Sequence, residues 1–426
     1  MLIVISVIFA IAFLIGVPIA FSFGLAGAVY LLFWEGLPAS LLVRRIYFVL
    51  DSFPLLAVPL FIMIGHLSER AGLIPSLLEW LQLLVGWMKG GIAYINVLAS
   101  MLFAGVSGTA VSDVASLGRI EIQMMRRSGY DLSFCCALTA ASSIVGPIVP
   151  PSVAMIIYAL AAGNISIGGL FLAGAIPGFL LGGALLVYAY FMTRGREPVE
   201  RSIAKPIDLV TNTLSVLPLL GLPLIIIGGV VGGFVTVTES AAIGVIYVLV
   251  IGFGLTRELQ LADIYDAFVH SAKTSSILAM LMGAGAIVSW ILIRNQATAQ
   301  LAEFMAGISS DPTVFMLGVL GTLLVVGMVM EATAVIIALA PLLAPVALGY
   351  GIHELQFGLV FCMTVLLGMI TPPVGVVLFL TASVGETSIE KLSRAIIPCI
   401  LIVAVVIVAV VFFPSLTLWL PGLFGL

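Results

Sequence analysis

Two short segments each place adjacent prolines inside an apolar run that is long enough to cross a bilayer: GPIVPPS at 146–152 and GMITPPV at 368–374. Both follow the pattern Gly-x-Ile-x-Pro-Pro, 222 positions apart. Proline lacks a backbone donor and clashes with the preceding turn, so these residues predict two broken helices. The freed carbonyl and amide groups need water, ions or a ligand as partners. The prolines at the breaks are Pro150, Pro151, Pro372 and Pro373.

The apolar segment at 91–126 is interrupted by GVSGTAVSD, which is rich in small polar residues. A chain that reverses inside a membrane exposes backbone dipoles at its tip, and glycine lets that backbone approach an ion or a carboxylate closely. Hydroxyl and carbonyl oxygens are hard ligands that suit sodium. The alternative is that these residues only allow close helix packing. The residues concerned are Gly105, Ser107, Gly108, Thr109, Ser112 and Asp113.

A second interrupted segment, at 313–349, carries one ionisable residue, Glu331, among apolar neighbours. An ionisable group at that depth is costly in a membrane, so a functional role is the default interpretation. Arg294 ends the preceding predicted span. It either extends to the lipid headgroups from an interfacial position, or points inward as a substrate-binding cation and a partner of Glu331.

Composition excludes most other classes of protein. Hydrophobic residues make up 62% of the 426 residues, charged residues 8%, and the mean hydropathy is +1.31. Such a chain predicts an all-α polytopic membrane protein in a lipid bilayer, with no soluble enzyme domain and no nucleic-acid partner. No organic cofactor is expected, and no ATP-binding glycine-rich loop occurs. Four cysteines without metal-type spacing indicate packing residues: Cys135, Cys136, Cys362 and Cys399.

The double prolines belong to an internal repeat. Shifting the chain by 222 positions also aligns Gly105 with Gly327 and Gly163 with Gly385. The chain is therefore divided into a first repeat at 1–193, a cytoplasmic linker at 194–212 and a second repeat at 213–426. The first repeat is expected to contain an extra helix at 1–16, a hairpin at 91–126 and a broken helix at 132–162. The second is expected to contain a hairpin at 313–349, a broken helix at 356–384 and a last helix at 395–420.

Basic residues predict the orientation. The longest polar stretch, RGREPVERSIAK at 194–205, is expected to be cytoplasmic, and the hairpin at 91–126 then enters from the cytoplasm. The hairpin at 313–349 has no nearby Lys or Arg and is expected to enter from outside. Two re-entrant hairpins of opposite orientation define an inverted-topology repeat, with the N-terminus in the cytoplasm. The stretches 37–52 and 257–273 mix charged and apolar residues and predict interfacial helices.

These features together resemble a known family. GVSGTAVSDVASLG, GPIVPPS, the Glu-bearing second hairpin and ITPPVG resemble the large membrane subunit, DctM, of tripartite ATP-independent periplasmic (TRAP) transporters, over essentially all 426 residues. The resemblance implies a sodium-coupled elevator carrier in a bacterial inner membrane, and not an enzyme. It also implies a small four-helix membrane subunit of the DctQ type as a partner. A periplasmic binding protein of the DctP type would deliver carboxylate substrates such as C4-dicarboxylates or sialic acid.

The resemblance also suggests site residues. Ser107 and Thr109 match the family's Ser-Gly-Ser/Thr element for ions and substrate, and Arg294 and Glu331 match its basic and acidic substrate-side positions. We expect these four residues to contact the substrate. The expected sodium ligands lie at the hairpin tips and the helix breaks: Ser107, Thr109, Ser143, Gly146, Val149, Gly327, Thr333, Gly368 and Thr371.

Two other functions fit parts of the chain. GVSG at 105–108 matches the Gly-x-Ser-Gly pattern of intramembrane rhomboid proteases, but the later histidines, His270 and His353, lie near predicted helix ends. That chemistry needs a histidine beside the serine. A stand-alone sodium–carboxylate symporter with the same inverted architecture would need neither partner protein. Transport in liposomes without a binding protein would favour this last alternative.

Overall fold

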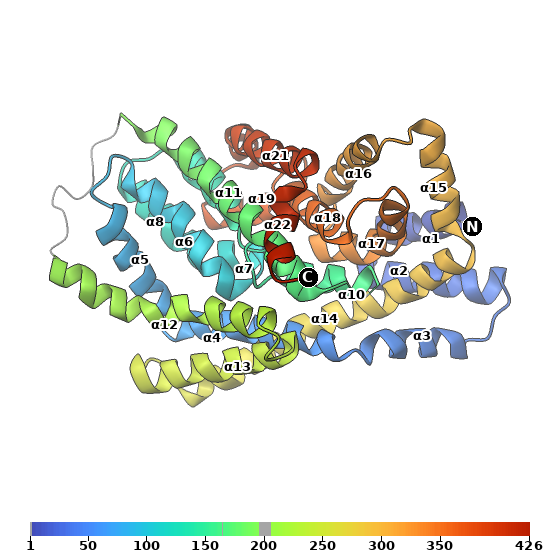
Figure 1. Cartoon of the computed structure of the whole chain (residues 1–426), viewed down its shortest axis with the longest axis horizontal. Coiled ribbons are helices and arrows are strands. Elements are labelled where there is room, and N and C mark those ends of the chain that lie inside the picture. Colours follow the sequence, from blue (N-terminus) through green and yellow to red (C-terminus); the bar gives the residue numbers. More distant parts are fainter. Residues whose placement is uncertain (1, 164, 196–205) are drawn as a thin grey trace.

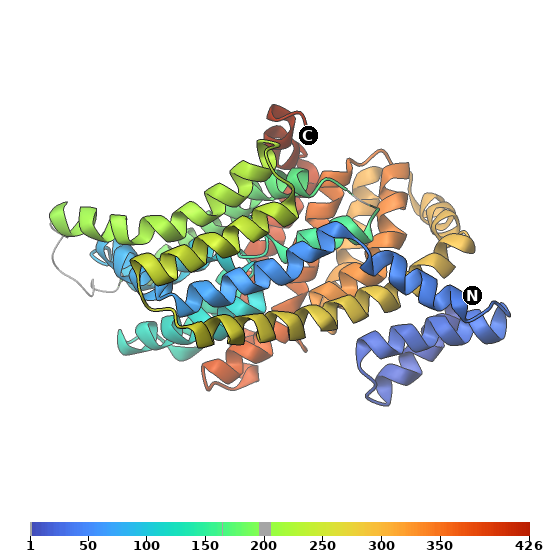
Figure 2. The ribbon, with the colours of Figure 1, turned by 90° about the horizontal axis from the view of Figure 1, so that it is seen from below.

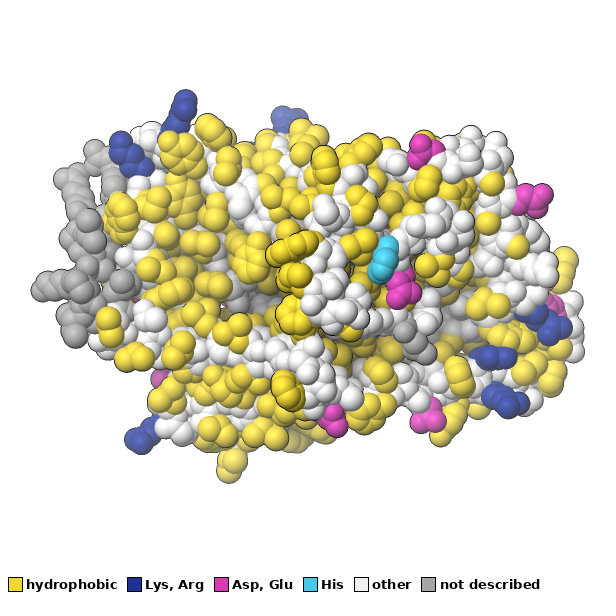
Figure 3. Space-filling model, in the orientation of Figure 1, with side chains coloured by type: hydrophobic (Ala, Val, Ile, Leu, Met, Phe, Trp, Pro, Cys, Tyr) yellow, Lys and Arg dark blue, Asp and Glu magenta, His cyan; other side chains and the backbone are white. Residues whose placement is uncertain are grey.

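The chain is helical throughout the part that the structure describes. The computed structural model describes residues 2–163, 165–195 and 206–426, and every regular element within those ranges is a helix. Apolar side chains cover much of the face in Figure 3, where charged side chains are few and lie mostly toward the periphery. Leu14, Phe33 and Phe234 are at least 83% exposed. An apolar outer surface of this extent suits a lipid environment.

Several helices are long enough to cross a membrane. A bilayer core of about 30 Å requires roughly 20 helical residues. Within the described residues, six helices meet the length and composition expected of a span, or up to eight if two bent pairs each count as one. The six are Phe53–Arg70, Ile167–Thr193, Val210–Val231, Val237–Leu255, Leu261–Arg294 and Ala332–Gly349. The bent pairs are Ala297–Ile308 with Pro312–Gly327, at 114°, and Ile389–Ala395 with Ile397–Phe412, at 46°.

The first half of the chain contains one helical hairpin and one broken helix. Its helices are α1 Leu2–Leu14, α2 Ile19–Val29, η1 Tyr30–Trp34, α3 Ser40–Leu50, η2 Phe53–Leu56, α4 Ala57–Arg70, α5 Leu73–Val85, α6 Gly91–Ser107, α7 Ala110–Asp113, η3 Val114–Gly118, α8 Arg119–Arg127, α9 Leu132–Ser143, α10 Val153–Ala161 and α11 Ile167–Thr193. The first arm of the hairpin is α6, and the returning arm consists of α7, η3 and α8. The broken helix consists of α9 and α10, separated by residues 144–152.

The second half repeats this order. Its helices are α12 Pro206–Val231, α13 Val237–Val250, η4 Ile251–Leu255, α14 Leu261–Arg294, α15 Ala297–Ile308, α16 Pro312–Gly327, α17 Ala332–Gly349, α18 Glu354–Met369, α19 Val376–Val384, α20 Ile389–Ala395, α21 Ile397–Phe412 and α22 Ser415–Leu423. The hairpin is α16 with α17, and the broken helix is α18 with α19. The starts of α9 and α18, and of α11 and α20, are 222 positions apart.

Long tilted helices form a layer along one side of the molecule. Figure 2 shows α12, α13, α4 and α14 running side by side across the near face, and contacts join α12 to α13, α13 to α4, and α4 to α14. In Figure 1 the same helices lie along the lower side, with the hairpins and broken helices above them. We call these four helices the long-helix layer. The hairpins and broken helices, which we call the body, pack directly against this layer, for example α17 on α14 and α6 on α4.

The second broken helix lies at the centre of that body. Every residue of α18 from Leu355 to Met369 is buried. The helix packs against both arms of its own hairpin, α16 and α17, and against α21 and α10. Because α18 is apolar all around, its burial excludes lipid and water from the first half of the broken helix. The break that follows it is thus held in the interior of the protein.

Three elements differ from the sequence expectations. Residues 257–273 do not form a separate interfacial helix, because α14 contains no proline and continues unbroken from Leu261 to Arg294. The helix α15 was not predicted, since its 12 residues are too few for a span. The expected last helix at 395–420 is divided, because α21 ends at Phe412 and Pro414 precedes α22.

Three further expectations concern other regions. The predicted interfacial stretch 37–52 contains a separate helix, α3, which has no buried residue and packs against α14. In the expected linker at 194–212, residues 196–205 lie outside the described part of the structure, and α12 already begins at Pro206. All four cysteines are buried and free. Their burial is consistent with a packing role.

Candidate functional site

The first hairpin reverses at Gly108 and Thr109. Gly108 has φ +62°, a left-handed conformation that glycine adopts readily. The hydroxyl oxygen of Thr109 accepts a hydrogen bond from the Ser112 N–H at 3.2 Å and so caps α7. Val153 donates its N–H to the Gly108 carbonyl at 3.4 Å, which joins the tip to the start of α10. The side chain of Ser107, an expected ion and substrate ligand, lies outside the described part of the structure.

The first break is closed by Ser152. Its hydroxyl donates to the Pro147 carbonyl at 2.5 Å and accepts from the Met155 N–H at 3.3 Å. The first bond spans the unwound segment, and the second caps α10. The Pro150–Pro151 peptide bond is cis, as is its counterpart, Pro372–Pro373, in the second half. The Ser152 hydroxyl thus links the unwound segment to the start of α10.

Three expected sodium ligands of this break are buried. The Ser143 hydroxyl donates to the Ala140 carbonyl at 2.9 Å. Val149 packs against Gly178 of α11, where an added Cβ would lie 2.6 Å from Val149 Cγ2. Within the described residues, no backbone N–H is bonded to the carbonyl of Gly146 or Val149. A buried carbonyl requires a partner, so these two oxygens are suitable cation ligands.

The second hairpin reverses at Glu331. Its carboxylate accepts a hydrogen bond from the Thr333 N–H at 2.9 Å and another from the Thr333 hydroxyl, which makes it the N-cap of α17. The N-terminus of a helix carries a partial positive charge that stabilises an anion. Glu331 is therefore held by a helix end and by a hydroxyl group.

The second tip is joined to the second break through backbone groups. Gly375 donates its N–H to the Met328 carbonyl at 2.8 Å. Gly327 and Gly368 lie in close contact, since a Cβ added at Gly368 would come within 2.6 Å of the Gly327 carbonyl carbon. The hydroxyl of Thr371 donates to the Leu367 carbonyl at 2.7 Å. The expected ligands Gly327 and Gly368 are thus in contact, and Thr371 bonds to the last turn of α18 beside Gly368. Thr333 and Glu331 follow Gly327 in the chain, at the tip of the hairpin.

The two halves use equivalent positions for the same contacts. Thr109 and Glu331, 222 positions apart, both cap the returning arm of a hairpin. Val153 and Gly375, also 222 positions apart, both donate a backbone hydrogen bond to a tip carbonyl. In addition, α17 packs against α10, and α19 packs against α7 and η3. Each returning arm therefore lies against the half-helix of the other half, and the tips and breaks form one unit.

The structure does not pair Arg294 with Glu331. The Arg294 Nε lies 3.1 Å from Glu35 Oε2, and the guanidinium lies 5.4 Å from the centre of the Trp290 ring. The Arg294 side chain is 51% exposed. Because α14 continues unbroken to its end, it brings Arg294 beside Glu35 at the end of η1. In the chain, the helices α15 and α16 lie between Arg294 and Glu331. Of the two alternatives for Arg294, the pairing with Glu331 is therefore not formed in this structure.

The donor groups at the tips and breaks suit a hard cation. The described residues contain no group of three or more His, Cys, Asp or Glu side chains placed to hold one metal ion. The groups present are hydroxyls, backbone carbonyls and the Glu331 carboxylate. Apart from that carboxylate, these donors are neutral oxygens, which suit a sodium-like cation. The arrangement is thus suited to a cation that binds and leaves.

Two carboxylates lie buried behind the first tip. Asp113 is 1% exposed at the end of α7, and Glu121 is 2% exposed in α8. The sequence pattern included Asp113 in the tip but missed Glu121, because Arg119 and Arg126 nearby suggest a solvated helix. The missed signal is helical spacing: Glu121 lies one turn before the buried Met125, on the apolar face of α8.

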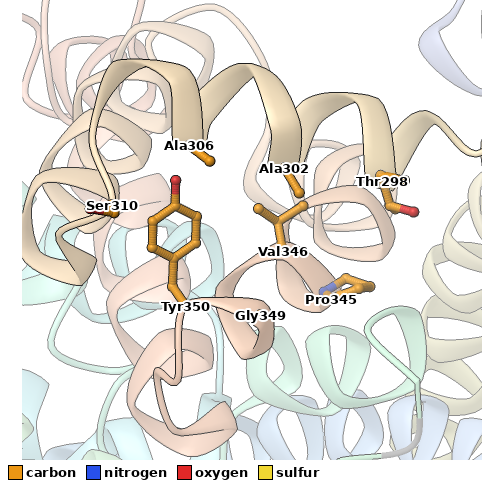
Figure 4. A pocket seen from close by; sticks show the side chains of 9 residues that line it. Thr298, Ala302, Ala306, Ser310, Pro345, Val346, Gly349 and Tyr350 are labelled. Carbon is orange, nitrogen blue, oxygen red and sulfur yellow. The ribbon is translucent and has the colours of Figure 1, made fainter.

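A cavity of about 500 Å³ lies between α15 and α17, away from the tips. In Figure 4 the Tyr350 side chain points from the end of α17 toward α15, and its hydroxyl donates to the Ser309 carbonyl at 2.9 Å. Glu331 caps the opposite end of α17. The cavity therefore belongs to the periphery of the second hairpin. Its lining includes Thr298, Ala302, Ala306, Pro345, Val346 and Tyr350.

Together, the helical spans and the two sets of hairpin and broken helix define a polytopic helical membrane protein. The structure is similar to that of the YdaH transporter of Alcanivorax borkumensis, with a TM-score of 0.65 and 16% identity. The similarity covers 89% of this chain and 88% of that one. At this level of identity the likeness concerns the fold alone.

Sequence comparison then identifies the family. The model of the tripartite ATP-independent periplasmic transporter DctM component matches residues 6–416. The sialic acid TRAP transporter large permease protein SiaM of Vibrio cholerae is 35% identical over 409 residues, which are 96% of either chain. The isethionate TRAP transporter permease protein DctMQ of Oleidesulfovibrio alaskensis is 33% identical over 97% of this chain and 65% of its own length. The chain belongs to the DctM family and is a transporter permease, not an enzyme.

Proposed function

We propose that this permease takes up organic acids by a sodium-coupled elevator mechanism. The observation that carries the proposal is the matched connection of each hairpin tip to a break, made by the N–H groups of Val153 and Gly375. Each bond holds the oxygen groups of one tip beside the break of the same half. The relative SiaM is named for the transport of sialic acid, which favours a carboxylate-bearing substrate. The class of substrate is thus proposed to be organic acids with a carboxylate group.

In this proposal the body of hairpins and broken helices moves against the long-helix layer. The two hairpins are re-entrant and enter from opposite sides of the membrane, as in an inverted-topology repeat. A direct contact between body and layer is made by Gly105 of α6, where an added Cβ would lie 2.5 Å from Cγ of Pro223 in α12. Displacement along this contact would carry the loaded site from one side of the membrane to the other.

Sodium is proposed to bind at both tip-and-break regions before the substrate. A cation there offsets the cost of removing a carboxylate from water and orders polar groups that otherwise face solvent. Thr109 and Glu331, with Ser107, are proposed to contact the substrate. Arg294 is not included, because its ion pair is with Glu35. The proposed sodium ligands are Ser107, Thr109, Ser143, Gly146 and Val149 in the first region, and Gly327, Thr333, Gly368 and Thr371 in the second.

Two partner proteins complete the proposed system in a bacterial inner membrane, with the N-terminus of this chain in the cytoplasm. One is a small four-helix membrane subunit of the DctQ type. The relative DctMQ supports this partner, because its name joins M and Q and its chain extends beyond the region that matches ours. The other is a periplasmic binding protein, which is expected to carry most of the substrate selectivity.

Reconstitution in liposomes with both partners tests the proposal. Uptake of an organic acid should require an inward sodium gradient, and equal uptake with potassium or choline in place of sodium would contradict the proposal.

The variant Glu331→Gln should weaken transport without lowering the unfolding temperature, because glutamine keeps an oxygen for the cap. The matched control is Asp311→Asn, since Asp311 caps α16 by accepting from the Thr313 N–H at 2.7 Å outside the proposed site. Uptake without the binding protein would instead indicate a stand-alone symporter.

A further inference from the structure

Three arginines lie where α3 meets the end of α14. Arg44 and Arg45 are adjacent on α3, and Arg294 is the last residue of α14. The two helices pack against each other. Figure 3 shows basic side chains gathered at the end of the molecule where Figure 1 places α3. We call Arg44, Arg45 and Arg294 the arginine cluster.

One tryptophan ring holds two of these guanidinium groups. The guanidinium carbon of Arg45 lies 4.8 Å from the centre of the Trp290 ring, and that of Arg294 lies 5.4 Å from it. A cation is attracted to the face of an aromatic ring. Because Trp290 precedes Arg294 by one helical turn, α14 presents the ring and its own arginine together to α3. Two like charges are thus held close together.

A single carboxylate offsets only part of this charge. Glu35 Oε2 lies 3.1 Å from Arg294 Nε, and Glu35 Oε1 accepts a hydrogen bond from the Asn295 amide at 2.8 Å. In the described part of the chain, no carboxylate lies within ion-pair distance of Arg44 or Arg45. Two of the three positive charges are therefore left without a counter-ion.

The guanidinium groups also have unused hydrogen-bond donors. None of the three arginines donates a side-chain hydrogen bond to another described residue. Arg45 Nε is buried and has no hydrogen-bond partner, and Glu35 Oε2, which faces Arg294, accepts no hydrogen bond. A buried donor without a partner is costly. An anion with several oxygen atoms is the ligand that would use these donors.

The side chains around the arginine cluster are those of a membrane boundary. The helix α3 has no buried residue, and Tyr47 and Phe48, one helical turn after Arg44, are exposed. Trp34, at the end of η1, is exposed as well. Exposed aromatic residues beside arginines are typical of segments at the level of the lipid headgroups. The anion that fits this place therefore has an apolar part.

The repeat shows that this helix contact forms without the arginine cluster. The equivalent contact in the other half joins the start of α14 to α4. The positions 222 residues away from the three arginines and Trp290 are, in the same order, Asp266, Ala267, Gly72 and Ser68. None of these is basic or aromatic. Helix packing alone therefore does not account for the arginine cluster.

We propose that the arginine cluster binds the phosphate headgroup of an anionic phospholipid. The phosphate oxygens accept hydrogen bonds from Arg45 and Arg294 together, because both guanidinium groups lie at Trp290. The acyl chains lie along the exposed apolar residues of α3. Such a lipid joins α3 to α14, a helix of the long-helix layer. The site contains none of the proposed sodium or substrate ligands.

Titration of the purified full chain with lipids in detergent, followed by native mass spectrometry, tests this site. Dioleoyl phosphatidylglycerol should bind more tightly than dioleoyl phosphatidylcholine, which has the same acyl chains but no net charge. In the double variant Arg44→Gln/Arg45→Gln, the dissociation constant for phosphatidylglycerol should rise about 30-fold, which corresponds to about 1 kcal/mol for each arginine.

The matched control is Arg126→Gln/Arg127→Gln, which removes an exposed pair of adjacent arginines at the end of α8. The control should bind phosphatidylglycerol as the wild type does. Equal weakening in both double variants would indicate attraction to any surface arginine and would overturn the proposal. So would unchanged affinity in Arg44→Gln/Arg45→Gln. Thermal unfolding separates the lipid from a free anion: phosphatidylglycerol should stabilise the wild type, and equal stabilisation by inorganic phosphate would contradict a lipid site.

The single variant Arg45→Lys guards against a change in folding. Lysine keeps the positive charge but lacks the planar group that stacks on Trp290 and donates to two oxygens. It should weaken binding, although less than the double variant does, and wild-type affinity would contradict the proposal. Without added lipid, all variants should unfold near the wild-type temperature, because α3 has no buried residue.

A protein partner is the competing occupant of this surface. If Arg44→Gln/Arg45→Gln binds phosphatidylglycerol normally but no longer co-purifies with the small membrane subunit, the arginine cluster is a protein interface and the proposal fails. None of these measurements depends on sodium-driven uptake, so the outcome is independent of the proposed function.

Discussion

Gly327 and Gly368 meet backbone to backbone where the first arm of the second hairpin crosses the second broken helix. A Cβ added at Gly327 would lie 3.0 Å from the Val365 carbonyl oxygen, and one added at Gly368 would lie 2.6 Å from the Gly327 carbonyl carbon. Backbone atoms cannot turn aside as a flexible side chain can. These glycines are therefore needed for close approach, and that approach holds the second tip against its break.

The substitution Gly368→Ala should lower the free energy of unfolding by about 1–3 kcal/mol, because the added methyl group overpacks a backbone contact. The measurement is thermal unfolding in detergent. The control is Gly321→Ala in α16, the hairpin arm that contains Gly327, where an added Cβ meets nothing within 4 Å. Alanine is the better helix former, so the control should gain roughly 0.5–1 kcal/mol. Equal effects of the two substitutions would contradict the proposed contact.

At the scale of the element, the first hairpin depends on one left-handed residue at its tip. Gly108 has φ +62°, and an added Cβ would lie 3.3 Å from Val153 Cγ2 and 3.4 Å from the Pro151 carbonyl oxygen. Any residue other than glycine at position 108 would thus have a strained backbone. Its side chain would also press against the break. The position of the tip relative to α10 follows from that packing.

Gly108→Ala should strongly reduce transport and also destabilise the protein. Gly351→Ala is the control, because Gly351 has φ +75° but open space around its Cβ position. A left-handed alanine costs about 1–2 kcal/mol at either place. Only the change at Gly108 also presses on the tip-to-break contact. Uptake measured in liposomes at matched protein amounts should fall for Gly108→Ala alone, and normal uptake by that variant would separate the tip from transport.

At the scale of the whole molecule, the body of hairpins and broken helices packs against the long-helix layer. Gly105 of α6 is in contact with Pro223 of α12, and an added Cβ at Gly105 would lie 3.0 Å from the Pro223 Cβ. Elevator motion requires this contact to break in each transport cycle. A covalent link across it is therefore a direct test of whether the body moves.

The double variant Gly105→Cys/Pro223→Cys should form a disulfide, because a Cβ separation of about 3.5–4.5 Å suits one and a small shift provides it. Oxidation should abolish uptake, and a reductant should restore it. The reduced double variant and the two single variants serve as controls, and the four native cysteines are buried. Unchanged uptake by the cross-linked protein would exclude displacement at this contact.

Local signals in the sequence predicted the places where helices break and turn. The double prolines predicted the ends of α9 and α18, and the glycine-rich sequence around Gly108 predicted the first tip. The 222-residue offset also predicted the common order of hairpin and broken helix in both halves. By contrast, α14 was predicted too short, because charged residues near its start suggested a boundary that no proline enforces. Prolines and glycines, which restrict or free the backbone, thus predicted the helix ends better than the positions of charged residues did.

The sequence by itself determined that this is an all-helical membrane protein of the DctM family, and where its backbone bends, because proline, glycine and apolar length act within one or two helical turns. Only the tertiary structure decided which polar groups meet. Asn96 binds Glu121 across 25 positions and Arg294 binds Glu35 across 259, whereas a pair of Arg294 and Glu331, one of the two alternatives for Arg294, does not form. The partner of a buried charge depends on which helix faces pack together. In helices that are apolar on all sides, the order of residues does not indicate which face meets which neighbour.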